Sequence, residues 1–194
     1  MSENKSDLYS GLIAKAEKFS ANTDIPKTVA VLGAGAMGMG IASALAEKAA
    51  INVNLYDIDV GQFKLAEDIP LIKGTTDLSE AVESADLVIE AVPEIMDLKK
   101  KVYAELDKVA DERIIFASNT STLPITEIAN TISRPKKFIG IHFFNPPQLM
   151  KLVEVIPGQE TSDEITSLTI NFVKSVNKVP VTCRKDVPGF IVNR

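Results

Sequence analysis

The sequence has one cysteine and no long apolar run. A single cysteine, Cys183, excludes an internal disulfide and fits a reducing compartment, so we predict a cytoplasmic protein. Its strand-like context favours a buried thiol over a reactive one. Because no stretch of about 18 apolar residues occurs, no membrane-spanning helix is predicted. The polar residues 1–7 predict no signal peptide.

The chain also lacks a long basic run. Its formal net charge of −5 excludes wholesale binding to nucleic acid or to a membrane surface, although a local pocket can still hold an anion. Hydrophobic residues make up 45% of the chain, which is enough for a single core. We therefore predict small-molecule partners, and we predict no metal site.

Short apolar runs alternate with helix-like segments from residue 28 onward. The predicted strands are Val29–Leu32, Val53–Tyr56, Leu87–Ala91, Ile114–Ala117, Phe138–Ile141, Leu152–Ile156 and Val179–Cys183. The predicted helices are Met37–Lys48, Ser79–Ser84, Met96–Ala110, Ile125–Thr131 and Asp163–Val176. Repeated strand–helix units are typical of an α/β fold, so we predict a Rossmann-type, doubly wound, mostly parallel sheet.

Three segments are expected along the chain. Residues 1–27 form an N-terminal extension, in which helical spacing of apolar residues predicts a helix over residues 8–19 that docks on the domain or on a partner. Residues 28–187 form the α/β domain. Residues 188–194 include an apolar stretch and are expected to begin a linker or helix leading to a further domain.

A Gly-x-Gly-x-x-Gly turn follows the first predicted strand and opens the first helix. Gly33 allows a tight turn, Gly35 lets the backbone approach a pyrophosphate, and Gly38 lets the helix pack closely on the strand. Ala36 and Met37 lie at the helix N-terminus, where free N–H groups favour phosphate. The turn therefore predicts a dinucleotide cofactor.

An acidic residue, Asp57, ends the next predicted strand. A carboxylate at this place accepts hydrogen bonds from ribose hydroxyls and repels a 2′-phosphate, which favours NAD over NADP. The alternative is an ordinary turn residue at a strand end.

The only histidine, His142, ends one predicted strand, and Glu154 lies on the next. Imidazole suits removal of a proton from an alcohol, and a carboxylate on its far nitrogen fixes the tautomer. A lone histidine beside two phenylalanines is otherwise more often a satisfied core residue. Glu154 favours the functional interpretation, because a carboxylate in an apolar strand needs a partner.

A run of small polar residues, Ser118-Asn119-Thr120-Ser121-Thr122, follows the strand before that pair. Ligands of doubly wound sheets bind at the carboxyl ends of strands, so these side chains are candidates for contact with cofactor or substrate. A loop that only caps the following helix fits the spacing equally well.

Taken together, these motifs resemble the NAD-dependent L-3-hydroxyacyl-CoA dehydrogenases, including the 3-hydroxybutyryl-CoA dehydrogenases, over about residues 28–194. The resemblance rests on Gly33–Gly38, Asp57, residues 89–94, residues 118–121, residues 142–146, residues 150–154 and residues 188–194. It implies oxidation of a (3S)-3-hydroxyacyl-CoA to the 3-ketoacyl-CoA, with hydride transfer to NAD.

The resemblance also implies a role for each matching position. His142 would remove the 3-hydroxyl proton, Glu154 would pair with it, and Ser121 would bind the substrate oxygen near the nicotinamide. Asn193 would face the substrate. The remaining matches would hold the cofactor or the site, and these are Glu94, Lys99, Asn119 and Asn145.

Two departures from the family qualify this prediction. Only residues 58–72 separate Asp57 from Lys73, where the family inserts a helical arm that contacts coenzyme A. The helical C-terminal domain, which in the family forms a homodimer, does not follow Arg194 in this sequence. A dehydrogenase of a non-CoA hydroxy acid and an NAD-binding interaction module therefore stay open as alternatives.

Overall fold

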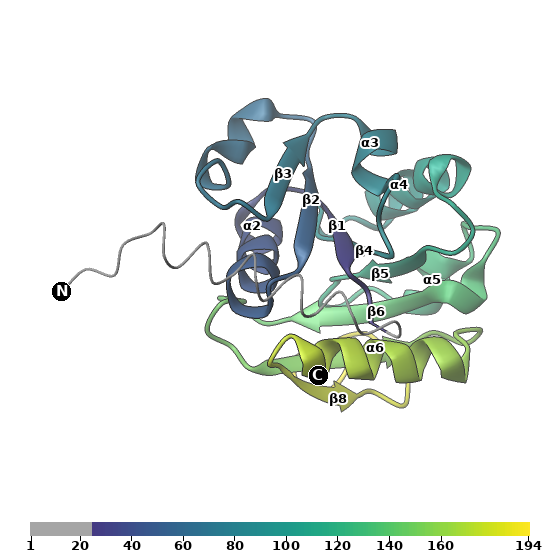
Figure 1. Cartoon of the computed structure of the whole chain (residues 1–194). Helices are drawn as coiled ribbons and strands as arrows, with labels where there is room; N and C mark the ends of the chain where they lie inside the picture. The colour runs from purple at the N-terminus through teal and green to yellow at the C-terminus, as the bar shows by residue number, and fades with distance from the viewer. Residues whose placement is uncertain (1–24) are drawn as a thin grey trace.

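The computed structural model describes residues 25–194, so the helix predicted over residues 8–19 lies outside the described residues. Its centre is an eight-stranded sheet with helices on both faces (Figure 1). The strands are β1 (Thr28–Leu32), β2 (Asn52–Tyr56), β3 (Ile72–Thr75), β4 (Leu87–Glu90), β5 (Ile115–Ser118), β6 (Phe138–Phe143), β7 (Leu152–Pro157) and β8 (Val179–Thr182). The α-helices are α2 (Ala36–Ser43), α3 (Leu78–Val82), α4 (Met96–Val109), α5 (Ile125–Ala129) and α6 (Asp163–Ser175). Shorter helical segments are η1 (Ala44–Lys48), η2 (Val60–Leu65) and η3 (Pro135–Lys137).

The strand order is β3-β2-β1-β4-β5-β6-β7-β8. The first six strands of the chain are parallel, β7 is antiparallel to β6, and β8 is parallel to β7. The direction of winding reverses between β1 and β4, and such a switch point opens a crevice for ligands at the carboxyl ends of the strands. The predicted doubly wound, mostly parallel sheet is confirmed.

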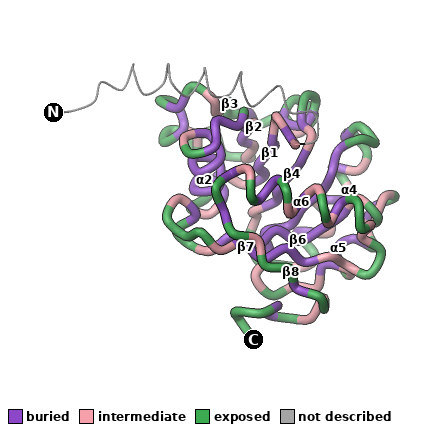
Figure 2. Tube along the Cα trace, turned by 60° about the horizontal axis from the view of Figure 1, so that its bottom comes forward, coloured by how far each residue is buried: buried purple, intermediate pink, exposed green. Residues whose placement is uncertain are grey.

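The core has two layers, one on each face of the sheet. In β1, Val29 and Val31 face the layer built with α2, η1 and α6, and Ala30 and Leu32 face the layer built with α3, α4 and α5. All four side chains are fully buried, as the purple strands in the interior of Figure 2 show. Because both faces are covered, the central strands are mostly apolar, which made them recognisable in the sequence.

Two elements differ from the sequence-based expectation. Strand β3 was missed because its sequence, Ile-Lys-Gly-Thr, has only one large apolar residue and forms a strand through its pairing with β2. The first helix was expected to run to Lys48 as one α-helix, but α2 ends at Ser43 and continues as the π-helical segment η1. Among the described residues, no helix combines the length and apolar character that crossing a membrane requires.

Helix α5 takes its N-terminal cap from a distant segment. Pro124, at its start, makes no side-chain cap. The carboxylate of Asp186 instead accepts hydrogen bonds from the backbone N–H groups of Ile125 (2.8 Å) and Thr126 (2.7 Å), and from the Thr126 hydroxyl. This contact fixes the segment after β8 against α5.

Candidate active site

The parallel strands bring the predicted site residues to one edge of the sheet. The glycine turn follows β1, the segment with Glu94 follows β4, the polar loop follows β5, and His142 lies near the end of β6. The site is therefore assembled from loops at the carboxyl ends of four neighbouring strands.

The three glycines of the turn differ in the space that a side chain at each position would find. Gly33 has a φ of 97°, and a Cβ there would lie 2.9 Å from the Ala91 carbonyl oxygen. A Cβ on Gly38 would lie 1.7 Å from the Gly33 carbonyl oxygen, so the close packing of α2 on the turn requires glycine. A Cβ on Gly35 would meet no atom within 4 Å. Gly35 and Ala36 are exposed at the start of α2, where no side chain caps the helix.

Asp57 holds the glycine turn from the neighbouring strand. Its Oδ2 accepts a hydrogen bond from the Ala34 N–H (2.7 Å), and its Oδ1 accepts one from the Asp59 N–H (3.0 Å). Each carboxylate oxygen has a second lone pair, so the group can still accept from a ribose hydroxyl. The contact with Ala34 is a structural role that sequence reasoning had missed.

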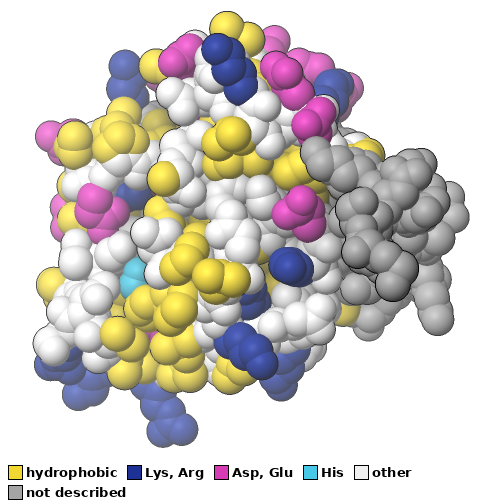
Figure 3. All heavy atoms as spheres, turned by 90° about the vertical axis from the view of Figure 1, so that its left-hand side faces the viewer, with side chains coloured by type: hydrophobic (Ala, Val, Ile, Leu, Met, Phe, Trp, Pro, Cys, Tyr) yellow, Lys and Arg dark blue, Asp and Glu magenta, His cyan; other side chains and the backbone are white. Residues whose placement is uncertain are grey.

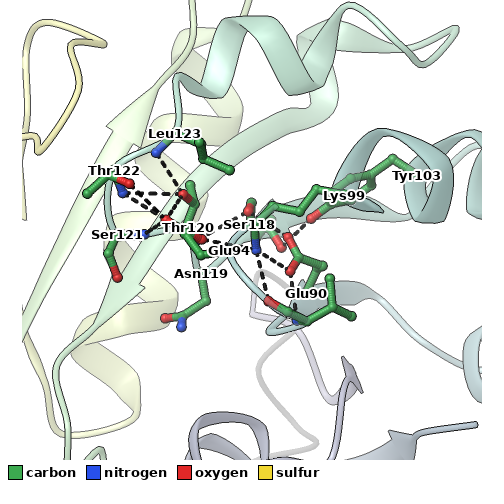
Figure 4. Close-up of polar contacts among 12 residues, drawn as sticks. Glu90, Glu94, Lys99, Tyr103, Ser118, Asn119, Thr120, Ser121, Thr122 and Leu123 are labelled. Atoms are coloured by element: carbon green, nitrogen blue, oxygen red, sulfur yellow. Dashed lines mark hydrogen bonds and ion pairs between the residues drawn. The ribbon is translucent and has the colours of Figure 1, made fainter. Parts of the chain in front are cut away.

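A buried ion pair lies beneath the next two loops (Figure 4). The Lys99 ammonium lies 2.5 Å from Glu90 Oε1, and both side chains are almost fully buried. Glu90 also accepts hydrogen bonds from the Val92 N–H (2.8 Å) and the Ser118 hydroxyl (2.7 Å). Burial raises the pKa of the Glu90 carboxyl, and the Lys99 charge opposes that rise.

Glu94 organises the polar loop after β5, as Figure 4 shows. Its Oε1 accepts hydrogen bonds from the Thr120 hydroxyl (2.6 Å) and from the backbone N–H groups of Ser121 (2.7 Å) and Thr122 (3.0 Å). Its Oε2 lies 3.4 Å from the Lys99 ammonium. Partial burial alone would raise the pKa of Glu94, but the Thr120 hydrogen bond, the Lys99 charge and the loop N–H groups together hold it below its usual value.

His142 and Glu154 face each other across β6 and β7, where they are paired in register. His142 Nδ1 lies 2.7 Å from Glu154 Oε2. The histidine is 4% exposed, and its colour forms only a small area among the surface atoms of Figure 3. The Phe144 ring lies with its centroid 4.5 Å from that of the imidazole. The pair is thus shielded, with the imidazole reaching the surface at one small point.

Residues 188–192 form turns. The turns bring the backbone N–H groups of Ile191 and Val192 to 3.0 Å from Glu154 Oε1. The Asn193 side-chain amide donates to the Ser121 carbonyl oxygen at 3.4 Å. Residues 188–193 thus contact both Glu154 and the loop that carries Ser121, and whether they lead to a further domain stays a prediction.

Comparison with known proteins identifies the family. The sequence profile described as "3-hydroxyacyl-CoA dehydrogenase, NAD binding domain" matches residues 28–69 and 61–187. The chain belongs to the 3-hydroxyacyl-CoA dehydrogenase family. The match confirms the predicted family and its cofactor, NAD.

Several relatives of the dehydrogenase family can be compared directly. Human mitochondrial hydroxyacyl-coenzyme A dehydrogenase is 40% identical over 202 residues, which cover 90% of this chain and 64% of the human protein. The crystal structure of (S)-3-hydroxybutyryl-CoA dehydrogenase from Ralstonia eutropha is 38% identical, with a TM-score of 0.81, and the match covers 87% of this chain and 66% of that one. The chain thus spans slightly less than two thirds of these relatives.

A third relative is named for a different substrate. The crystal structure of an NAD⁺-dependent dismutase, 5-formyl-3-hydroxy-2-methylpyridine 4-carboxylic acid 5-dehydrogenase, is 33% identical with a TM-score of 0.79. The match covers 85% of this chain and 60% of that one. The shared scaffold therefore occurs in a relative that is named for a small carboxylic acid rather than for a CoA thioester.

The NAD-binding residues predicted from the sequence fall into two groups. The open space at Gly35 and the uncapped start of α2 fit a pyrophosphate, with Ala36, partly exposed Met37 and Asp57 beside them. Lys99, by contrast, is 1% exposed and paired inside the protein. Lys99 reaches the polar loop after β5 through Glu94, whose Oε2 lies 3.4 Å from the Lys99 ammonium.

The last two predicted site residues, Asn119 and Asn145, lie just after β5 and β6. Asn119 Oδ1 accepts a hydrogen bond from the Phe143 N–H at 2.8 Å, which joins the ends of β5 and β6. Asn145 is exposed and precedes a cis peptide bond to Pro146. Sequence reasoning had missed Glu90, although a carboxylate in the apolar run of β4 carried the same signal that drew attention to Glu154.

Proposed function

We propose that the protein carries out NAD-dependent oxidation of a (3S)-3-hydroxyacyl-CoA to the 3-ketoacyl-CoA, with His142 and Glu154 as the acid/base pair. The observation that supports this most is the contact of 2.7 Å between His142 Nδ1 and Glu154 Oε2, at the sheet edge that also carries the glycine turn. A buried carboxylate next to an imidazole at a ligand-binding edge is the arrangement that general base catalysis needs.

Each residue has a defined task in this proposal. Glu154 accepts the Nδ1–H of His142, which leaves Nε2 with a free lone pair to take the 3-hydroxyl proton. NAD⁺, when bound, supplies the hydride acceptor. Ser121, whose backbone is held by Glu94, offers its hydroxyl to the substrate oxygen. Asn193, tied to the Ser121 carbonyl, lies where it can contact the same substrate.

The alternative substrate class is a free hydroxy acid without coenzyme A. Two observations favour it. Residues 58–71 between Asp57 and β3 contain only turns and the short segment η2, whose residues are not buried. The relative named for a pyridine carboxylic acid also uses this scaffold. Comparing NADH oxidation with acetoacetyl-CoA and with acetoacetate distinguishes the two classes, and a preference for the free acid overturns the CoA assignment.

Replacement of His142 tests the catalytic proposal. We expect His142→Gln to lower turnover of acetoacetyl-CoA roughly 10²–10⁴-fold, because a positioned acid/base contributes about that much. NADH affinity, measured by fluorescence titration, should not change. Lys101→Gln, on the exposed side of α4, is the matched surface control and should keep full turnover. Unchanged turnover in His142→Gln rejects the role.

The compartment and the assembly are also proposals. The single cysteine supports a location in the cytoplasm, whereas the human relative is named as a mitochondrial protein. Cell fractionation decides between them. Likeness to the family supports a homodimer of the complete protein, and sedimentation of that protein tests it.

A further inference from the structure

The segment over residues 187–193, which we name the clamp turn, has a strictly defined backbone. The Phe190 N–H donates to the Val187 carbonyl oxygen, and the Asn193 N–H donates to the Gly189 carbonyl oxygen, each at 3.0 Å. Gly189 has a φ of 81° and Phe190 a φ of 51°. A phenylalanine rarely takes a positive φ, and such a conformation persists only where the surroundings fix it.

The clamp turn donates two hydrogen bonds to one oxygen of the fully buried Glu154 carboxylate. Glu154 is 0% exposed. Its Oε1 accepts the N–H groups of Ile191 and Val192, each at 3.0 Å, and its Oε2 faces His142 Nδ1 at 2.7 Å. A buried carboxylate is costly unless its oxygens are hydrogen-bonded. The two backbone donors therefore supply the partners that His142 alone cannot.

We propose that the clamp turn is a positioning device for the acid/base pair, in which the N–H groups of Ile191 and Val192 fix the Glu154 carboxylate so that His142 keeps one tautomer. This inference rests on the proposed function, and it assigns residues 189–192 a role in it. Backbone groups act here, so the role does not depend on the side chains of Ile191 and Val192, which are exposed.

Two further contacts support a positioning role. The Phe190 ring is 2% exposed and lies with its centroid 6.0 Å from that of the His142 ring. Asn193 reaches the Ser121 carbonyl oxygen from the same turn. The clamp turn thus contacts the carboxylate, the imidazole and the loop proposed to bind the substrate oxygen. Displacement of the turn frees the carboxylate to rotate, and Nδ1 then loses its acceptor.

The chain itself offers a direct test. Cys183 is the only cysteine, so a synthetic peptide of residues 183–194 can be joined to residues 1–182 by ligation at that cysteine. Replacing the amides of residues 191 and 192 by esters removes the two donors and keeps every side chain. An ester at residue 194, whose N–H does not contact Glu154, is the matched control. Gly189→Ala is a second variant, because its Cβ would lie 2.8 Å from the Asn193 carbonyl oxygen.

His142 is the only histidine, so ¹⁵N-histidine NMR of an untagged protein reports on one imidazole. At alkaline pH we expect the native chain and the residue 194 ester to show the Nδ1–H tautomer alone. The double ester and Gly189→Ala should show a mixture of tautomers, with kcat reduced roughly tenfold or more and the Kd of NADH unchanged. In a Glu154→Gln background, the same changes should have no further effect on kcat.

The outcomes separate this inference from the proposed function. A double ester that folds with the native melting temperature and keeps the pure Nδ1–H tautomer overturns the clamp. If Glu154→Gln also leaves the tautomer and kcat unchanged, the acid/base pair itself is wrong. An equal loss of kcat from Gly189→Ala with and without Glu154 would show a general structural effect, and this too overturns the clamp.

Discussion

Substitution of Gly35 by alanine should strongly weaken cofactor binding without harming the fold. Gly35 is the N-cap of α2 with φ −65° and ψ −175°, an extended conformation open to any residue. Alanine at an N-cap costs about 0.5–1 kcal/mol relative to glycine, and the reduced freedom of the unfolded chain returns about 0.4–1 kcal/mol. Since the new Cβ meets no atom within 4 Å, the free energy of unfolding should hardly change.

In the predicted binding mode, the same methyl group would occupy the space that a pyrophosphate needs for contact with the turn. A hydrogen bond to a charged group contributes about 1.5–3 kcal/mol, so the loss of two costs about 3–6 kcal/mol. That is a roughly 10²–10⁴-fold weaker Kd for NADH. Fluorescence titration of NADH measures it, and a thermal melt of the same sample measures stability.

Gly38→Ala is the matched comparison within the turn. Its Cβ would lie 1.7 Å from the Gly33 carbonyl oxygen, so α2 must move away from β1. We expect a loss of about 3 kcal/mol, or a Tm lower by roughly 6–12 °C. If Gly35→Ala binds NADH as tightly as the native protein, the pyrophosphate does not approach this turn and the assignment is refuted. A fall in Tm equal to that of Gly38→Ala would contradict the open space at Gly35.

Three further predictions concern charged side chains. Asp57→Asn should narrow the preference for NADH over NADPH, because the carboxylate no longer repels a 2′-phosphate, and titration of both cofactors checks this. Glu94 has a folded pKa below its unfolded value, so its stabilisation is present above the unfolded pKa of about 4.3 and disappears as the pH falls through the lower folded value. The free energy of unfolding, measured by urea denaturation across acidic pH, should therefore differ less and less between the native protein and Glu94→Gln as the pH falls. A difference that stays constant with pH would contradict this prediction. Lys99→Met leaves the Glu90 charge buried without a partner and should cost about 3–5 kcal/mol, and Glu90→Gln in the same chain should recover part of this in the same urea assay.

The strands that face helices on both sides were predictable from the sequence. Apart from Thr28 and Glu90, β1 and β4 are apolar runs, because such strands pack on a helix layer on both sides. The local composition of β3 carries no such signal. The conformation of β3 is decided by its pairing with β2. The spacing of the two segments in the sequence does not reveal which residues of β3 pair with which residues of β2.

In the candidate site, too, local features were predictable from the sequence, and contacts between distant segments were not. The glycine turn is local, so residue order alone predicted its shape. Glu154 makes three contacts with two distant segments, and backbone N–H groups supply two of these contacts. A backbone donor has no signature in a sequence, since every residue except proline carries one. The burial of Glu90 was signalled by its apolar neighbours, but its partners Lys99 and Ser118 become apparent only from the fold.

The cap of α5 by Asp186 has a consequence for the order in which the chain matures during synthesis. A helix as short as Ile125–Ala129 is not stable alone, and its start depends on a carboxylate made some sixty residues later. While the ribosome adds β6, β7 and α6, the residues of α5 still lack the Asp186 carboxylate that caps them. Asp186 must leave the exit tunnel before it can cap α5, so the N-terminal cap of this helix forms only after the strands and the helix between them have been made.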